Sequence, residues 1–313
     1  MDQFLVSLMN GVIYGLLLFM VSAGLTLIFG MMGVLNFAHA SFYMLGAYFA
    51  YTLQDLVGFW GAVLVSPVLV GLVGVAVERF FLRRVHQYGH AHELLLTFGL
   101  SFIVAESIKL FFGNFPVDYR IPAALDVPAF AIGGAQYPVY RLLMGGIAIA
   151  MFIVIYLLLT RTRVGIVVRS AIYKPRMAEA LGHNVPLVFM GVFGVGAALA
   201  GLAGAVAGAF YTTNPNMALE LGVMVFVVVV VGGLGSLGGA MLASLLIGVV
   251  TSLAVSVDRS LADLFALVGA SAWARDVGGL LTLKISSLSA TIPFALMLLI
   301  LLVRPGGLMG EKV

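Results

Sequence analysis

Cysteine is absent from this chain of 313 residues, which excludes disulfide bonds and thiol chemistry but identifies no compartment. Charged residues are also scarce: they make up 9% of the chain, against 62% hydrophobic residues and a mean hydropathy of +1.15. Such a composition excludes a soluble globular domain. No Asp, Glu, Lys or Arg occurs from Gln3 to Gln54. Because a helix crosses a membrane with about 20 apolar residues, this segment holds about two crossings.

The apolar segments are continuous and rich in Gly, Ala, Leu and Val. They lack the alternation with polar residues that membrane barrel strands show over about 10 positions. We therefore predict an all-α fold: one transmembrane domain over residues 1–313, built as a polytopic helical bundle with broken, glycine-rich helices. About eight or nine spans are expected, because the segment 221–231 is short and can also be part of one longer, interrupted span. The predicted spans cover residues 4–29, 37–53, 58–77, 94–112, 139–160, 187–210, 221–231, 240–257 and 289–303.

The basic residues gather in a few loops. One loop contains Arg79, Arg83 and Arg84, and another begins at Arg161. Two predicted crossings separate the loops, so both lie on the same side, which the positive-inside rule identifies as the cytoplasm. The loop 113–138 is then expected outside. The net charge of +3 suits this orientation and gives no reason to expect nucleic acid as a partner.

The second basic loop, from Arg161 to Pro186, carries the start and stop signals of a short helix. Pro175 suits the first helical turn, and Gly182 can adopt the left-handed conformation that ends a helix. We predict a helix over residues 175–182 with a small apolar face between basic flanks. In one interpretation this helix contacts a cytoplasmic partner. In the other, the loop lies against anionic lipid headgroups, which also attract cations.

A second polar segment follows the first predicted span. Gly30 and Gly33 permit a helix break there, which frees backbone groups to meet a ligand or a neighbour. Asn36 and His39 come next, and such side chains are costly in hydrocarbon unless they are hydrogen-bonded or face water. One interpretation is a broken helix beside a translocation path. The other is a tight turn on the cytoplasmic side, in which His39 caps backbone carbonyls.

A glycine run covers residues 232–239. It does not match a phosphate-binding loop, because no Lys followed by Ser or Thr completes the motif. We predict a helix break or close helix packing there. Gly201, Gly204 and Gly208 are likewise predicted to be close helix–helix contacts.

No catalytic or metal-binding constellation is found in the sequence. His86, His90 and His92 lie in a basic loop without well-spaced carboxylate or thiolate support for zinc. Glu106 and Lys109 stand three residues apart on a predicted helix, which favours an ion pair on one helix face. A proton-coupling carboxylate at Glu106 is the alternative. No loop is long enough for an ATPase domain, so any energy source other than an ion gradient must come from a partner.

Several segments carry a resemblance, in order along nearly the whole chain. They are Gly24–His39 (GLTLIFGMMGVLNFAH), Phe42–Tyr48 (FYMLGAY), Leu96–Ser101 (LTFGLS), Pro175–Val185 (PRMAEALGHNV), Gly232–Met241 (GGLGSLGGAM) and Arg304–Gly310 (RPGGLMG). The chain resembles the permeases of the branched-chain amino acid (Liv-type) ABC importer family, in particular the shorter, LivH-like type. It departs from the family's pattern in a longer segment at about 257–287 and in Ala40, where the family often has Gly.

The resemblance implies two functional regions. The helix 175–182 would be a coupling helix that docks on an ATPase; the residues assigned to it and its flanks are Arg169, Lys174, Arg176, Met177, Ala178, Glu179, Ala180, Leu181 and Gly182. The second region would line or shape the translocation path; the residues assigned to it are Gly30, Gly33, Asn36, Phe37, His39, Thr97, Ser101, Gly232, Gly233, Gly235, Ser236, Gly238 and Gly239.

The resemblance also implies partners and a place in the cell. These are a second, LivM-like permease subunit, two ATPase subunits that hold the ATP and Mg, a periplasmic substrate-binding protein, and the lipid of a bacterial inner membrane. The chain itself is expected to be neither an enzyme nor a holder of a cofactor. A gradient-driven carrier or channel is the rival interpretation, and a passive scaffold is a third.

Overall fold

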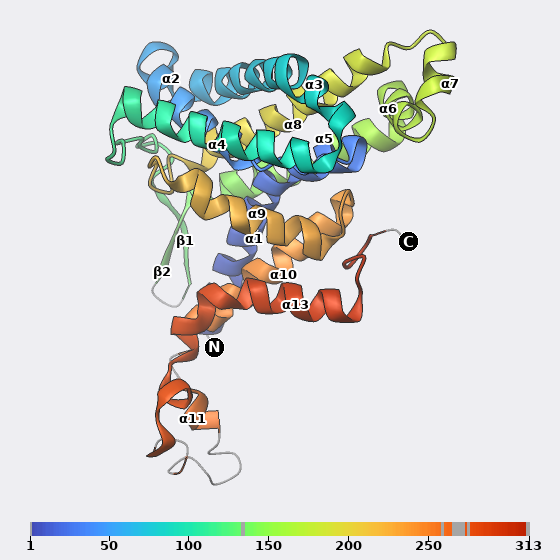
Figure 1. The fold of residues 1–313 in the computed structure, drawn as a ribbon. Coiled ribbons are helices and arrows are strands. Elements are labelled where there is room, and N and C mark those ends of the chain that lie inside the picture. Colours follow the sequence, from blue (N-terminus) through green and yellow to red (C-terminus); the bar gives the residue numbers. More distant parts are fainter. Residues whose placement is uncertain (1, 133–134, 258–259, 265–272, 274–275, 311–313) are drawn as a thin grey trace.

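The computed structural model describes residues 2–132, 135–257, 260–264, 273 and 276–310, and it confirms the helical membrane bundle (Figure 1). The helices in chain order are α1 (Asp2–Met32), α2 (His39–Val77), α3 (Arg83–Val85), α4 (His90–Phe112), α5 (Val139–Arg161), α6 (Arg163–Tyr173), α7 (Pro175–Ala180), α8 (Val185–Ala207), α9 (Met217–Gly232), α10 (Leu237–Ser256), α11 (Leu261–Leu264) and α13 (Ile292–Val303). The chain also contains a π-helical turn (Glu78–Leu82) and 3-10 turns (His86–Tyr88, Gly279–Thr282 and Ile285–Thr291).

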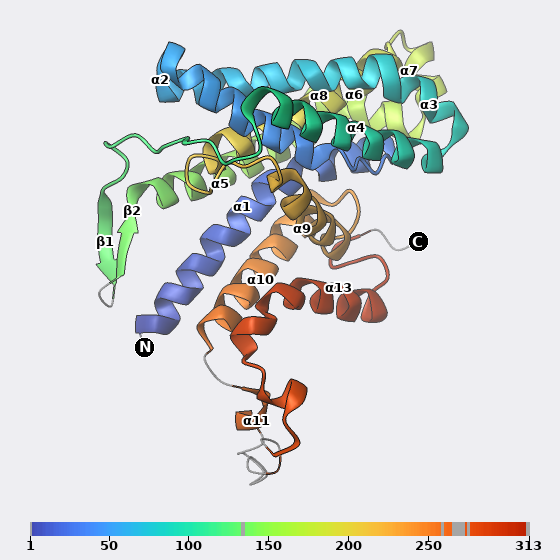
Figure 2. The same cartoon turned by 60° about the vertical axis from the view of Figure 1, so that its left-hand side comes forward.

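Seven helical segments of the described chain are long and apolar enough to cross a membrane. One of them, from His39 to Tyr88, contains two of the predicted spans. The backbone is non-helical at Gly58 (φ 73°, ψ 169°), and α2 reverses its direction there, as Figures 1 and 2 show. The short apolar helix α9 accounts for the remaining predicted span. The difference between seven and nine therefore lies in one hairpin and one helix of 16 residues.

Helix pairs in the core approach closely because glycines of one helix lie against the backbone of the other. α2 packs along α8, and α1 packs along α10. A Cβ atom on Gly46 would collide with the backbone of Gly201, and one on Gly204 would collide with the carbonyl oxygen of Tyr43. The predicted small-residue contacts at these α8 glycines are confirmed.

The glycine run 232–239 is a break between α9 and α10. Gly235 lies against Gly30 of α1, so that a Cβ on Gly235 would stand 2.7 Å from the Gly30 Cα. The segment after α13 closes over the same break: the Leu308 N–H donates to the Val231 carbonyl (2.8 Å) and the Met309 N–H to the Gly232 carbonyl (3.0 Å). The predicted break and the predicted close packing therefore both occur here.

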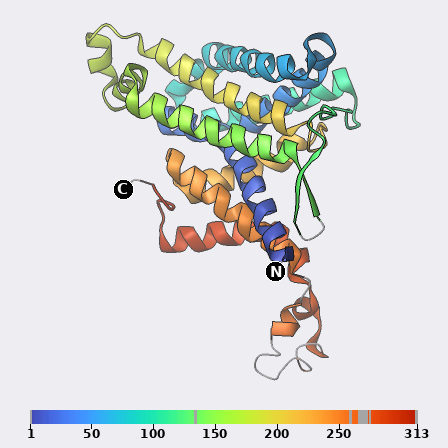
Figure 3. The same ribbon diagram turned by 180° about the vertical axis from the view of Figure 1, so that it is seen from behind.

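The two ends of the bundle differ. A two-stranded antiparallel hairpin, β1 (Pro128–Ile132) and β2 (Ala135–Pro138), lies at one end, and α6 and α7 lie at the other, as Figures 1 and 3 show from opposite sides. Arg83 Nη2 donates to the carbonyl of Pro186, at 2.8 Å. The two basic loops therefore meet at the α7 end, as the charge pattern predicts.

Substituting Gly204→Val tests the close packing of α2 on α8. The added side chain would meet backbone atoms, which cannot move aside as a flexible side chain can. We therefore expect a loss of about 1–3 kcal/mol in the free energy of unfolding. Gly146→Val on α5 is the control, because no atom lies within 4 Å of a Cβ at that position. Thermal unfolding followed by size-exclusion chromatography measures both variants, and an equal loss in the two would contradict the packing argument.

Candidate functional site

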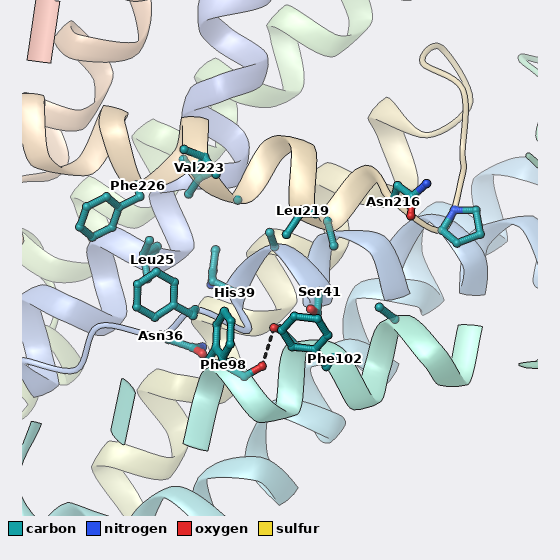
Figure 4. Close-up of a pocket in the computed structure, with 18 of the residues that line it drawn as sticks. Leu25, Asn36, His39, Ser41, Phe98, Phe102, Asn216, Leu219, Val223 and Phe226 are labelled. Atoms are coloured by element: carbon teal, nitrogen blue, oxygen red, sulfur yellow. Dashed lines mark hydrogen bonds between the residues drawn. The ribbon is translucent and has the colours of Figure 1, made fainter. Parts of the chain in front are cut away.

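A cavity of about 310 Å³ lies between the α1–α2 connection, α4 and α9 (Figure 4). Its volume is at the lower end of the roughly 300–1,000 Å³ that small-molecule sites occupy. Four residues assigned to the path from the sequence line it, namely Asn36, Phe37, His39 and Ser101. The break after the first helix thus faces a space large enough for a small solute.

Hydrogen bonds from side chains hold the α1–α2 connection in place. Gly33, which has a φ of 66°, directly follows the end of α1. The Asn36 Oδ1 accepts from the Ala38 N–H (3.0 Å), and the Thr97 Oγ1 of α4 accepts from the Phe37 N–H (3.2 Å). Thr97 is not among the residues that line the cavity. Its hydrogen bond instead connects α4 to the backbone that forms the cavity wall.

His39 combines features of both alternatives considered for its segment. The Nε2 lies 2.9 Å from the Val21 carbonyl oxygen, which can only accept, so this nitrogen carries the hydrogen. The ring thus binds a carbonyl, as a capping residue would, while the residue also lines the cavity. The His39 Nδ1 and the Asn36 Nδ2 are buried and have no hydrogen-bond partner among the described residues.

The end of the cavity next to the break is aromatic. The ring of Phe37 meets that of Phe98 edge-on (centroids 6.4 Å apart) and stacks on that of Phe226 (6.1 Å). Phe98 also contacts Phe102, one turn further along α4, at 4.9 Å. This end offers apolar ring surface to a solute.

The other end of the cavity is polar. Figure 4 shows Asn216 at the end away from Phe226, and α4 runs toward it from Phe98 through Phe102. The next turn of α4 brings Glu106 and Lys109, both of which line the cavity. The Lys109 Nζ lies 2.7 Å from the Glu106 Oε1, which confirms the predicted ion pair and places it at the cavity.

The remaining residues assigned to the path lie outside the cavity lining. These are Gly30, Gly33, Thr97, Gly232, Gly233, Gly235, Ser236, Gly238 and Gly239. Ser236 caps α10 by accepting from the Gly239 N–H at 3.1 Å. The glycines allow α1, the α9–α10 break and the C-terminal segment to approach one another, so they shape the bundle that carries the cavity.

The predicted helix of the second basic loop is α7, which begins with Pro175. Gly182 ends it with a φ of 86°, and the His183 N–H donates to the Ala178 carbonyl at 3.0 Å. Ala178 is buried in a small cluster with Ala171 and Val185. This contact fastens α7 to the bundle by one face and leaves the other face free.

Two exposed apolar side chains, four residues apart, form an apolar face on the free side of α7. Met177 is 60% exposed and Leu181 is 77% exposed. The other exposed residues assigned to this region are Arg169, Lys174, Arg176, Glu179, Ala180 and Gly182. An apolar surface with charged surroundings at the end of a membrane bundle fits contact with another protein.

Sequence reasoning missed a buried carboxylate beside this end. Glu93 is 1% exposed, and its two oxygens contact the Nδ1 of His86 and the Nδ1 of His90, the latter at 3.1 Å. Nearby, Glu78 and Arg83 form an ion pair at 2.8 Å. The spacing of His90 and Glu93, three residues apart on a helix, could have indicated their contact. The contact between Glu93 and His86 depends on the fold.

A smaller cavity of about 140 Å³ adjoins these side chains. Glu78, Arg83, His86 and Glu179 line it, so it brings α7 together with the segment between α2 and α4. In the part of the chain that the structure describes, no group of three or more metal-ligating side chains could hold a metal ion.

Comparison with known proteins identifies the family. A family model described as a branched-chain amino acid transport system permease component matches residues 7–302. This chain belongs to that family. The permease is 26% identical to the high-affinity branched-chain amino acid transport system permease protein BraD of Pseudomonas aeruginosa, with 99% of this chain and 96% of that protein covered.

Two further relatives extend the comparison. The permease is 26% identical to the protein named LivH of the same kind of system in Escherichia coli K12, over 98% of this chain and 96% of that protein. It is 28% identical to a probable branched-chain amino acid permease LivH of Methanocaldococcus jannaschii, over 78% of this chain and 79% of that protein. No solved structure matches. The permease is thus a multi-pass membrane protein of a transport system.

Substituting Thr97→Val tests the tie between α4 and the cavity wall. The variant leaves the Phe37 N–H without its acceptor, so we expect a loss of about 1–3 kcal/mol in stability. Thr97→Ser keeps the hydroxyl and should stay close to the native protein. Ser101→Ala is a second control, because the Ser101 hydroxyl donates to the Phe98 carbonyl of its own helix at 2.6 Å. Unfolding temperatures in detergent measure the three variants, and a Thr97→Val value equal to that of Thr97→Ser would contradict the proposed tie.

Proposed function

We propose that the permease is the transmembrane subunit of an ATP-driven importer for branched-chain amino acids or related small amphiphilic solutes. The observation that carries the proposal is the exposed apolar face of α7 at the basic end of a bundle that also holds a solute-sized cavity. Family membership supports the solute class, since the relatives are named for branched-chain amino acids. No P-loop is present in the sequence, so ATP and Mg would be bound by two separate ATPase subunits.

The contacts of α7 supply a route for coupling. In this proposal an ATPase subunit binds Met177 and Leu181, and movement of α7 passes to α8 through the buried Ala178. At the start of α8, the Pro186 carbonyl accepts from Arg83, which leads to the segment before α4. α4 carries one wall of the cavity, so a rigid movement of α4 would open or close it. The cavity would then alternate between the two membrane faces.

The other proposed partners follow from the apolar surface that this chain leaves exposed. The cavity is open, and the exposed apolar side chains of α4 include Leu110 (81% exposed) and Phe111 (78% exposed). A second, LivM-like permease subunit would cover part of this surface, and lipid the rest. A periplasmic substrate-binding protein would deliver the solute at the hairpin end, in a bacterial inner membrane.

A gradient-driven carrier is the second candidate, and one observation favours it. Glu106, the carboxylate considered for proton coupling, lines the cavity. It is bound to Lys109 by an ion pair and is 67% exposed, which is not the setting of a buried proton carrier. Transport by this chain alone in a proton gradient would favour the carrier, whereas a strict need for ATP and ATPase subunits would exclude it.

The orientation of α7 can be tested by thiol labelling, because the chain has no native cysteine. Met177→Cys should react with a membrane-impermeant maleimide in inverted membrane vesicles and not in intact cells. Phe115→Cys, in the loop after α4 and 81% exposed, should show the reverse pattern. Labelling of Met177→Cys from outside intact cells would place α7 on the wrong side for an ATPase.

The coupling role of α7 can be tested with the double variant Met177→Asp, Leu181→Asp. Charges on the apolar face should abolish ATP-dependent uptake in proteoliposomes, by at least about tenfold, because burying two unpaired carboxylates in a protein contact is costly. The thermal stability of the permease itself should change little, since both side chains are exposed. Tyr88→Asp, an exposed position on the other basic loop, is the control and should retain most uptake. Native uptake by the double variant would refute coupling through this face.

A further inference from the structure

The Glu106–Lys109 pair retains hydrogen-bonding groups that can bind a ligand. Each side chain bonds the other through one contact, Lys109 Nζ to Glu106 Oε1. In the described part of the chain neither makes another side-chain hydrogen bond, so one carboxylate oxygen and two ammonium hydrogens remain available. The exposed fractions of 67% for Glu106 and 31% for Lys109 leave both heads within reach of the cavity space.

Ionisable side chains within a membrane span are costly and commonly face a cavity or a substrate path. An ion pair whose only task is to stabilise α4 gives a few tenths of a kcal/mol and needs no cavity. This pair faces the cavity, while the neighbouring Leu110 and Phe111 point away to the exposed apolar surface of the helix. Its position therefore matches a task inside the cavity.

The charge pattern of the pair selects the kind of ligand. A solute with one net charge would enter an apolar space with part of its charge uncompensated, which is strongly unfavourable. A zwitterion brings an ammonium group and a carboxylate on neighbouring atoms and has no net charge. Placed beside Glu106 and Lys109, it completes a ring of four alternating charges, in which every charge has an opposite neighbour on each side.

The aromatic end of the cavity completes the match. Phe98 and Phe102 (Figure 4) are followed by Glu106 at the next turn of α4, so the cavity wall changes from aromatic to charged along one helix. A solute with a zwitterionic head and a branched apolar side chain has the same order of polarity. We propose that Glu106 binds the ammonium group and Lys109 the carboxylate of an α-amino acid, whose apolar side chain lies against Phe98 and Phe102.

This inference rests on the proposed function, because it assigns the head-group site of the same transported solute. It is tested in the complete importer in lipid nanodiscs, with a thiol reporter inside the cavity. Val223→Cys supplies the reporter, since Val223 lines the cavity (Figure 4) and the chain has no other cysteine. The rate of its reaction with a small methanethiosulfonate is measured with and without ligand. Phe115→Cys, outside the cavity, shows whether any protection is specific.

Four probes of similar shape separate the two charges. They are L-leucine, 3-methylbutylamine (no carboxylate), 4-methylpentanoate (no ammonium) and 4-methylpentanamide (no charge). With the native pair we expect leucine to protect the reporter at concentrations at least about tenfold lower than the other three probes. Such a factor corresponds to about 1.4 kcal/mol. Better protection by the neutral amide than by leucine would overturn the assignment to a zwitterion.

Two substitutions then test which side chain holds which group. Glu106→Gln should weaken protection by leucine about tenfold or more and leave 4-methylpentanoate unchanged or tighter, because Lys109 is released. Lys109→Met should weaken leucine similarly and leave 3-methylbutylamine unchanged or tighter. A merely structural pair predicts equal effects on all four probes, because its loss would disturb the cavity as a whole.

The result is separable from the proposed function. ATP-dependent leucine uptake by the native importer, together with equal effects of the two variants on all probes, overturns the head-group site and leaves the importer intact. Protection of Phe115→Cys to the same degree as Val223→Cys also overturns the site. If the native importer shows no ATP-dependent uptake while the crossed pattern appears, the proposed function fails and the amino-acid site stands.

Discussion

The structure depends on one constraint: within hydrocarbon, a helix can be interrupted only where the freed backbone groups find partners. The connection between α1 and α2 meets this requirement with side chains, since Asn36 binds the Ala38 N–H and Thr97 binds the Phe37 N–H. Thr97 belongs to a different helix. The same bonds that satisfy the backbone therefore position α4 beside the break, and the space between them is the cavity.

The second break, between α9 and α10, meets the constraint with backbone instead. The segment after α13 donates from Leu308 and Met309 to the last carbonyls of α9, and Ser236 caps α10. Gly235 of this break lies against Gly30, in the last turn of α1 before the first break. This close contact between glycines leaves no room for a larger residue at either position.

Polar side chains that make hydrogen bonds or ion pairs lie at three places along α4. The buried Glu93 with its two histidines begins α4, Thr97 binds the cavity wall one turn later, and the Glu106–Lys109 pair lies further along the same helix. Arg83, just before α4, reaches the start of α8 beside α7. The segment from Arg83 through α4 therefore has contacts both at the start of α8, beside α7, and along the cavity.

The sequence by itself determined the helical membrane bundle, the common side of the basic loops and the start of α7 at Pro175, because hydropathy, charge bias and Pro and Gly signals act locally. It also indicated which glycines pack closely. Only the tertiary structure decided that Thr97 supports the wall instead of lining it and that Glu93 is buried between histidines. These outcomes depend on which helices become neighbours, and that follows from packing between residues far apart in the chain.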